Sequence, residues 1–247
     1  MSISSFGSSL SQGFNLLVSQ NALMGNSFTT KFGINRAVST TMVDVWSHSS
    51  TMTYLTTAET HLVTSDSVLD TLLGTGAQVV HITGLNNSYE LITEVLNLNG
   101  LTGTTTTNSY IRIFDVIVIA AGSTFSNQGN ISFVSTTSAN LSAYIQADDN
   151  QTQQLQYTIP DSKTGYFYGG QWFVSNGKET KFDLQIRTFG SIWRTVTTVL
   201  TDISDNLTYA FPVAIPAKTD LRIRAKATTG THEVSALWSM LLVDDGY

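Results

Sequence analysis

The first half of the chain is built from short runs rich in Val, Ile, Thr and Tyr that are separated by turn-forming residues. Asn86-Asn87 and Asn99-Gly100 are two of these separators, and Asn and Gly tolerate the left-handed backbone that tight turns require. Runs of this length between such turn signals are typical of antiparallel β-structure. The pattern continues over residues 51–157, and it restricts that part of the chain to an all-β fold.

We predict six strands in the first half of the chain and seven in the second. The first six lie near residues 60–64, 78–83, 90–97, 109–120, 129–136 and 143–147. The other seven lie near residues 153–159, 164–174, 181–188, 193–200, 208–215, 220–227 and 234–243. In the strand at 220–227 the period of two predicts that Leu221, Ile223 and Ala225 face inward. This pattern predicts two antiparallel β-sandwich or jelly-roll-like domains in tandem, preceded by an extended N-terminal arm.

A change in charge near residue 150 marks the predicted domain boundary. Residues 1–159 contain nine acids and three bases, whereas residues 160–247 contain nine of each. We therefore expect an N-terminal arm over residues 1–35, a first β-sandwich domain over 36–149 and a second over 150–247.

The N-terminal arm is rich in Ser, Gly and Asn but carries four spaced apolar residues, Phe6, Leu10, Phe14 and Leu17. Their spacing would place them on one face of a short helix, although the glycines and serines between them weaken that helix. Four large apolar side chains are a poor choice for a solvated tail. We therefore expect these residues to contact a neighbouring subunit, with a disordered terminus as the alternative.

The composition predicts a polar surface with few charges. Charged residues make up 12% of the chain, about half the usual share, whereas 36 Thr and 28 Ser supply about a quarter of it. The bases before residue 160 are Lys31, Arg36 and Arg112, and no basic patch is present, which argues against nucleic-acid binding. A Thr-coated surface with few charges is easily desolvated against another protein, and this favours a subunit of an assembly.

The sequence predicts no export signal, membrane segment or cofactor. There is no Cys, so a disulfide framework and a thiolate metal site are excluded. The first 30 residues contain no Lys or Arg and no continuous apolar core, unlike a signal peptide. No apolar run approaches the 18 or more residues of a membrane helix. We expect a protein made in a cytoplasm and without contact to a membrane.

No set of residues predicts catalysis or metal binding. The four histidines are scattered: His48, His61, His81 and His232. They lack further ligands at a zinc-like spacing, and no GxSxG motif occurs. The acidic pairs Asp148-Asp149 and Asp244-Asp245 lack the spacing of a calcium loop. We interpret them as solvated turns, with a calcium site between subunits as the alternative.

Five aromatic residues surround Gly169-Gly170: Tyr166, Phe167, Tyr168, Trp172 and Phe173. The period of two places Tyr166, Tyr168 and Trp172 on one face of the strand and the two phenylalanines on the other. We interpret the cluster as core or subunit packing. The alternative is a platform for sugars, because flat rings suit the apolar faces of glycans.

Several segments, taken in order, carry a resemblance to a known family. They are KFGIN (31–35), DVWS (44–47), GTGAQVVHITGLNNSYELITEVLNLNG (74–100), NSYIRIFDVIVIAAGS (108–123), NQGNISF (127–133), QTQQLQYTIPDSKTGYF (151–167), KTDLRIRAKA (218–227) and VSALWSMLLVD (234–244). Their order and spacing resemble a family of virion structural proteins of tailed phages, cyanophages among them. The resemblance covers about residues 31–244, and the arm before Lys31 lies outside it.

The resemblance implies a non-enzymatic virion component that is assembled in the host cytoplasm. Within the particle we expect a decoration or cement protein on the head surface. Its partners would be the major capsid protein and further copies of itself, contacted through the arm and through edge strands available for pairing. A neck, collar or tail-fibre component of the same virion is the first alternative. A carbohydrate-binding adhesion module is the second, and it rests on the aromatic cluster alone.

Overall fold

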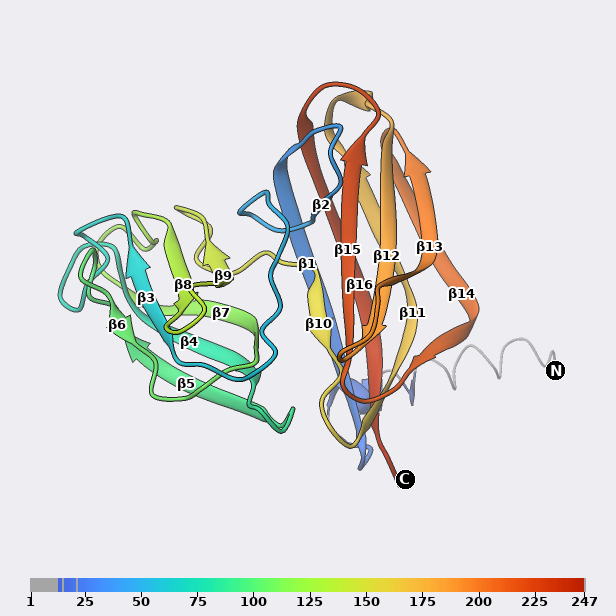
Figure 1. The fold of residues 1–247 in the computed structure, drawn as a ribbon, viewed down its shortest axis with the longest axis horizontal. Coiled ribbons are helices and arrows are strands. Elements are labelled where there is room, and N and C mark those ends of the chain that lie inside the picture. Colours follow the sequence, from blue (N-terminus) through green and yellow to red (C-terminus); the bar gives the residue numbers. More distant parts are fainter. Residues whose placement is uncertain (1–12, 15, 21, 247) are drawn as a thin grey trace.

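The computed structural model describes residues 13–14, 16–20 and 22–246. It shows two β-sandwich lobes side by side, a larger one that contains both ends of the described chain and a smaller one (Figure 1). All paired strands are antiparallel, so the predicted all-β sandwich class is confirmed. Over the described ranges, no helix has both the length and the apolar character needed to cross a bilayer.

The larger lobe consists of nine strands in two packed sheets. The strands are β1 (Asn26–Val38), β2 (Val43–Asp44), β10 (Gln156–Thr158), β11 (Lys163–Val174), β12 (Thr180–Thr188), β13 (Arg194–Thr201), β14 (Ser204–Ile215), β15 (Thr219–Ala227) and β16 (His232–Asp244). One sheet has the order β1-β16-β11-β14, and the other has the order β10-β15-β12-β13 with β2 added to β15. A 3-10 turn, η1 (Ser175–Gly177), follows β11.

The smaller lobe consists of seven strands, also in two sheets. The strands are β3 (His61–Ser65), β4 (Ala77–Leu85), β5 (Leu91–Asn97), β6 (Thr104–Thr105), β7 (Arg112–Ala121), β8 (Ile131–Ser135) and β9 (Leu141–Ile145). Their orders are β6-β3-β8-β9 and β5-β4-β7. Apart from the two-residue β6, each strand overlaps a strand that the sequence predicts.

The smaller lobe is an insertion between β2 and β10 of the larger one. β1 pairs with β16 from Asn26↔Val243 to Asn35↔Val234, so the two ends of the chain share one sheet. Residues 26–35, which the sequence prediction assigned to the arm, therefore form most of a strand. The segments that lead into and out of the smaller lobe also touch each other, through an antiparallel bridge at the residue pair 46 and 154.

Apolar packing continues from one lobe into the other. The core of the larger lobe surrounds the fully buried rings of Trp172 and Trp238. Ile111 and Phe114 of the smaller lobe belong to the same cluster, and Phe114 stacks on Tyr157 with ring centroids 4.4 Å apart. The smaller lobe has a second core of its own around Phe133 and other residues.

The alternation of β15 follows the prediction on its inner face and departs from it on its outer face. Leu221, Ile223 and Ala225 are at most 1% exposed and point into the sandwich, as predicted. Arg222, predicted to face outward, does so but is only 7% exposed. The reason is that the Trp193 ring, from the segment between β12 and β13, covers its guanidinium, while Gln185 of β12 and Asp44 of β2 contact it from either side.

The loops at one end of the smaller lobe are held by a single buried carboxylate. Asp70 is fully buried and accepts a hydrogen bond of 2.6 Å from Ser65 Oγ. It also accepts hydrogen bonds of 2.8 Å from the backbone N–H groups of Ala77, Gln128 and Gly129. Asp70 thus joins three chain segments at one point.

Replacing Asp70 with Ala should lower the free energy of unfolding by about 3 kcal/mol or more, because several buried donors lose their acceptor together. Asp205→Ala, at an exposed position of β14, should change it by less than about 0.5 kcal/mol. Urea denaturation followed by tryptophan fluorescence measures both. Equal effects of the two variants would show that the loops hold without Asp70.

Candidate functional site

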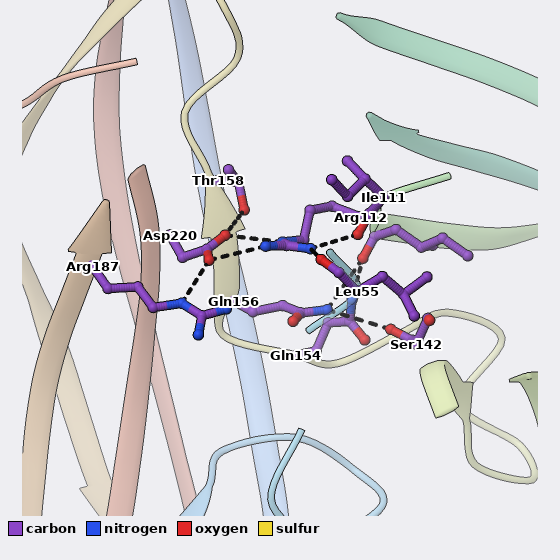
Figure 2. Close-up of polar contacts among 10 residues, drawn as sticks. Leu55, Ile111, Arg112, Ser142, Gln154, Gln156, Thr158, Arg187 and Asp220 are labelled. Carbon is purple, nitrogen blue, oxygen red and sulfur yellow. Dashed lines mark hydrogen bonds and ion pairs between the residues drawn. The ribbon is translucent and has the colours of Figure 1, made fainter. Parts of the chain in front are cut away.

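A buried network of polar contacts lies where the two lobes meet (Figure 2). Arg112, the first residue of β7, reaches from the smaller lobe to Asp220 on β15. Its Nε and Nη2 atoms donate to Asp220 Oδ1 and Oδ2 at 2.9 and 3.0 Å. The two residues are 5% and 0% exposed. A bidentate arginine–carboxylate pair combines strength with a fixed geometry, so it orients one lobe on the other.

The remaining hydrogen-bonding groups of this pair are also used. Arg112 Nη1 donates to the carbonyl oxygen of Leu55 at 2.8 Å. Asp220 Oδ1 accepts from Thr158 Oγ1 at 2.6 Å, and Oδ2 accepts from Arg187 Nε at 2.9 Å. Each carboxylate oxygen therefore has two donors. Such saturation is what a buried ion pair needs in order to offset its loss of hydration.

Two glutamines extend the network along the edge of β7. Gln154 Nε2 donates to the carbonyl oxygens of Ile113 and Phe114 at 2.8 and 3.1 Å. Gln156 Nε2, from β10, donates to the same Ile113 oxygen at 3.2 Å. These carbonyls lie at the junction, away from water, and each would be costly to bury without a donor.

A second buried carboxylate, Asp44, lies beneath the segment that leads into the smaller lobe. It accepts a 2.7 Å hydrogen bond from the N–H of Met52, and its Oδ1 lies 3.5 Å from Arg222 Nη1. Burial raises the pKa of Asp44, and the nearby Arg222 only partly opposes this. The Trp193 ring covers Arg222, with the guanidinium carbon 3.9 Å from the ring centroid. Such stacking shields a guanidinium from water at little cost.

Strand β1 adds two further contacts between the lobes. Lys31 is 2% exposed and donates to Asp115 and, at 2.7 Å, to a backbone carbonyl of β7. Burial lowers the pKa of Lys31, against the attraction of Asp115. Arg36 binds Asp149 with both terminal nitrogens, at 2.9 and 3.2 Å. With Arg112, all three bases before residue 160 bridge the lobes.

The polar groups of the junction bind one another and thereby hold the two lobes together. The oxygens of Asp220 are occupied by four donors, so this carboxylate is not free to take a proton from a substrate. Sequence analysis singled out neither Arg112 nor Asp220 as functional. The sequence signal that points to Arg112 is the scarcity of bases in that half of the chain. An isolated base in such a segment indicates a specific structural partner for its charge.

The four histidines lie on four different segments: His48, His61, His81 and His232. His61 Nε2 lies 2.8 Å from Ser142 Oγ, and both side chains are enclosed in the smaller lobe. His232 Nε2 lies 2.6 Å from Thr180 Oγ1. Throughout the described part of the chain, no three His, Asp or Glu residues are grouped in a way that could hold a metal ion.

The acidic pairs make separate local contacts. Asp148 accepts from Ser126 Oγ at 2.9 Å, while its neighbour Asp149 is the partner of Arg36. Asp244 pairs with Lys163 at the end of β16. Two of these four carboxylates thus belong to ion pairs, a role that the prediction of solvated turns did not include.

The aromatic cluster is divided by a bulge at Tyr168–Gly169, where the register of β11 shifts against both neighbouring strands. Phe167 and Trp172 are 0% and 1% exposed and lie in the same core. Their predicted placement on opposite faces is therefore wrong, because the bulge inserts one residue into the alternation. Tyr168 and Phe173 remain exposed but lie roughly 16 Å apart along the strand, so they do not form one platform.

The described part of the arm lies on the chain's own sheet. Residues 13–14 and 16–19 are helical. An apolar cavity of about 330 Å³ lies beneath them, lined mainly by Phe14, Val18, Phe28, Tyr168 and Leu241. Phe14 and Leu17 are 40% and 42% exposed, whereas Phe6 and Leu10 lie outside the described residues. The predicted contact of these four residues with a neighbouring subunit stays a prediction.

Exposed apolar side chains gather at two other places. One is the side of the larger lobe formed by β13 and β14, with Ile192, Leu200, Ile203 and Phe211. The other is the loops near Asp70, with Val68, Leu73, Leu101 and Phe125.

Comparison with known proteins assigns no family to this chain. No family model matches it, and no curated protein matches it. Among solved structures, it is weakly similar to a particle of infectious bursal disease virus, Gt strain, with 12% identity, 91% of this chain and 73% of the other covered, and a TM-score of 0.22. The VP2 subviral particle of the same virus gives 12% identity, 94% and 77% coverage and a TM-score of 0.20.

A lipoprotein of Bacteroides thetaiotaomicron gives 10% identity, coverage of 87% of this chain and 100% of the other, and a TM-score of 0.18. Alignments at this level are weak. They do not establish a shared fold.

Arg112→Ala should lower the free energy of unfolding by about 3–5 kcal/mol, because it leaves the buried Asp220 short of two donors. Lys226→Ala, at an exposed position of the same strand as Asp220, should change it by less than about 0.5 kcal/mol. Urea denaturation measures both. An Arg112→Ala variant as stable as Lys226→Ala would contradict a structural role for the pair.

Stability should fall on acidification because of His61. Burial lowers the pKa of His61 to about 4, whereas a histidine in an unfolded chain titrates near 6.5. The contribution of His61 is therefore present above about pH 6.5 and lost as the pH falls towards about 4, since the unfolded chain then binds the extra proton. This amounts to about 3 kcal/mol.

Denaturation midpoints across this pH range test the effect. His61→Gln should flatten the pH dependence, even if it lowers stability at every pH. His81→Gln, on the outer face of β4, is the matched control and should keep the wild-type slope. The same slope in both variants would assign the acid sensitivity to another group.

Proposed function

We propose that this chain is a non-enzymatic structural protein of a phage virion, and more specifically a decoration or cement protein on the head surface. The observation that carries the proposal is the junction, where Arg112, Lys31 and Arg36 are all used to fix two β-sandwich lobes in one arrangement. A component of a rigid lattice needs a body of fixed shape. The ordered resemblance over residues 31–244 to virion proteins of tailed phages supports the same conclusion.

The polar groups that would be suited to catalysis are used in support of the fold. His61 and Ser142 form a hydrogen bond, but His61 is 0% exposed and Ser142 8%. A substrate would have to open the smaller lobe to reach them. Asp220 is saturated by four donors, as described above. These contacts favour a non-enzymatic role.

The proposed partners are the major capsid protein and further copies of this chain. Phe14 and Leu17 support a contact through the arm, because both are about two fifths exposed although they belong to a helix that already rests on β-structure. The low charge of the chain also favours protein contact, since little hydration is lost when a Thr-coated surface is covered.

A neck, collar or tail-fibre component of the same virion is the second candidate, since a rigid body with exposed edges would serve there as well. The carbohydrate-binding alternative is weakened by the burial of Trp172, which is 1% exposed. Tyr168 and Phe173 are too far apart to stack on one sugar ring.

The number of copies per particle tests the proposal. Quantitative gel analysis of purified particles should find this chain in numbers comparable to those of the major capsid protein, since a decoration protein follows the capsid lattice. A number that is a small fraction of the capsid copies would favour the neck, collar or tail. Absence of the chain from purified particles would overturn the virion role.

Limited proteolysis tests the contact through the arm. The bond after Leu17 should be cleaved more slowly in assembled particles than in the free protein, because a neighbouring subunit covers it. Cleavage within the exposed loop at Gly190 gives the comparison for general protection by the particle. Equal rates for Leu17 in both samples would remove the arm from the proposed contact.

A further inference from the structure

Strand β13 forms the outer edge of its sheet. It pairs with β12 on one side, from Thr180↔Thr201 to Ile186↔Arg194, and it ends the strand order of that sheet. Within the portion of the chain that the structure describes, residues 195–201 make no backbone hydrogen bond to a segment other than β12. β13 therefore presents a row of N–H and C=O groups that another extended backbone can pair in register.

The sequence of β13 offers little protection against such pairing. Residues 195–201 contain no charge and no proline, and all except Leu200 are β-branched. Edge strands are usually defended by charged side chains, prolines or bulges. A bulge at Val196 interrupts the ladder near its start, and residues 197–201 remain regular.

The two edge strands of the other sheet of the larger lobe, β1 and β14, are defended. At β1, Lys31 and Arg36 extend to the smaller lobe, which covers that side. β14 contains Pro212 and an irregular stretch in which residues 209–212 lie opposite Tyr168 alone. A free, regular and uncharged ladder is therefore a property that distinguishes β13 from these two strands.

The charges that flank β13 suit pairing with a second copy of the same strand. Arg194 and Asp202 lie at equal distances along the sequence on either side of Thr198. Both are exposed, and neither forms an ion pair with any residue that the structure describes. When the bulge at Val196 is taken into account, an antiparallel copy centred on Thr198 places Arg194 of each chain opposite Thr201 of the other, next to Asp202. Opposite charges are then neighbours at both ends of the ladder, and no like charges face each other.

The side chains of this ladder also match. Thr195 and Leu200 both lie on the outer face of the sheet, across from Gln185 and Lys181 of β12. When the bulge at Val196 is taken into account, Thr195 of one copy lies opposite Leu200 of the other. Leu200 is 58% exposed in the single chain, so the pairing removes apolar surface from water.

We propose that β13 pairs with β13 of a second copy of this chain, antiparallel about a two-fold axis near Thr198. The sheets β10-β15-β12-β13 of the two copies then form one continuous sheet. A self-complementary contact of this kind produces a closed dimer. The proposal deepens the proposed function by naming the contact within its homo-oligomer. It is tested on the purified chain, so its failure leaves the virion role standing.

A charge exchange tests the register. By sedimentation velocity at up to about 0.1 mM, the wild-type chain should have twice the mass of the monomer. Arg194→Asp and Asp202→Arg should each weaken dimerisation by about tenfold or more, because each places like charges at both ends of the ladder. The double variant should recover the wild-type mass. Asp205→Arg, at an exposed position on β14 in the other sheet, should leave it unchanged.

Cysteine cross-linking gives an independent measurement. The chain contains no Cys, so the thiol in Thr198→Cys is unique. Residues at the centre of an antiparallel pair lie at a distance that permits a disulfide. Thr198→Cys should form a covalent dimer under mild oxidation, whereas Thr137→Cys, exposed on the smaller lobe, should not.

Three results would overturn the proposal. The first is a wild-type chain that remains monomeric over the whole concentration range. The second is a dimer whose stability is the same in both single charge variants, or is not recovered in the double variant. The third is cross-linking of Thr198→Cys no faster than that of Thr137→Cys.

Discussion

The contact between Arg112 and Asp220 decides how the two halves of this molecule are oriented. Apolar packing around Phe114 supplies attraction between the lobes, but such packing is non-directional and accepts small changes of angle. A buried bidentate pair does not tolerate such changes. Any other arrangement of the two lobes would leave a full charge without partners in a medium of low dielectric constant. Compared with an apolar contact, the pair adds only modestly to the free energy of unfolding. Its larger effect is to select one relative orientation of the two lobes.

The ion pairs across the junction explain how a chain with so few charges can hold two lobes in one arrangement. Lys31, Arg36 and Arg112 are the bases of the first 159 residues, and each is paired with a carboxylate across the junction. These three bases are thus used to fix the arrangement of the lobes, and Thr and Ser supply much of the polarity of the surface. A surface with few charges loses little hydration when another protein covers it, as the proposed role in a virion would require.

Most of the fold follows from local sequence, because β-branched runs, turn residues and the period of two are local signals. The strands and the inward face of Leu221 were predictable for that reason. Three features were not. The pairing of β1 with β16 joins opposite ends of the chain, the bulge at Gly169 shifts the alternation by one residue, and the burial of Arg222 depends on Trp193 and on Asp44, which lies far earlier in the chain. Each of these three features depends on residues that are distant in the sequence.

The pairing of β1 with β16 has a consequence for biosynthesis. β1 is translated before every other described strand, whereas its partner β16 is translated after them. The smaller lobe, whose strands all lie between residues 61 and 145, can fold while the ribosome is still making the rest. During that time β1 is an unpaired strand tethered to a folded lobe, and closing this loop is slow because it spans nearly the whole chain. Among the described strands, it is therefore β16 whose pairing completes the larger sandwich.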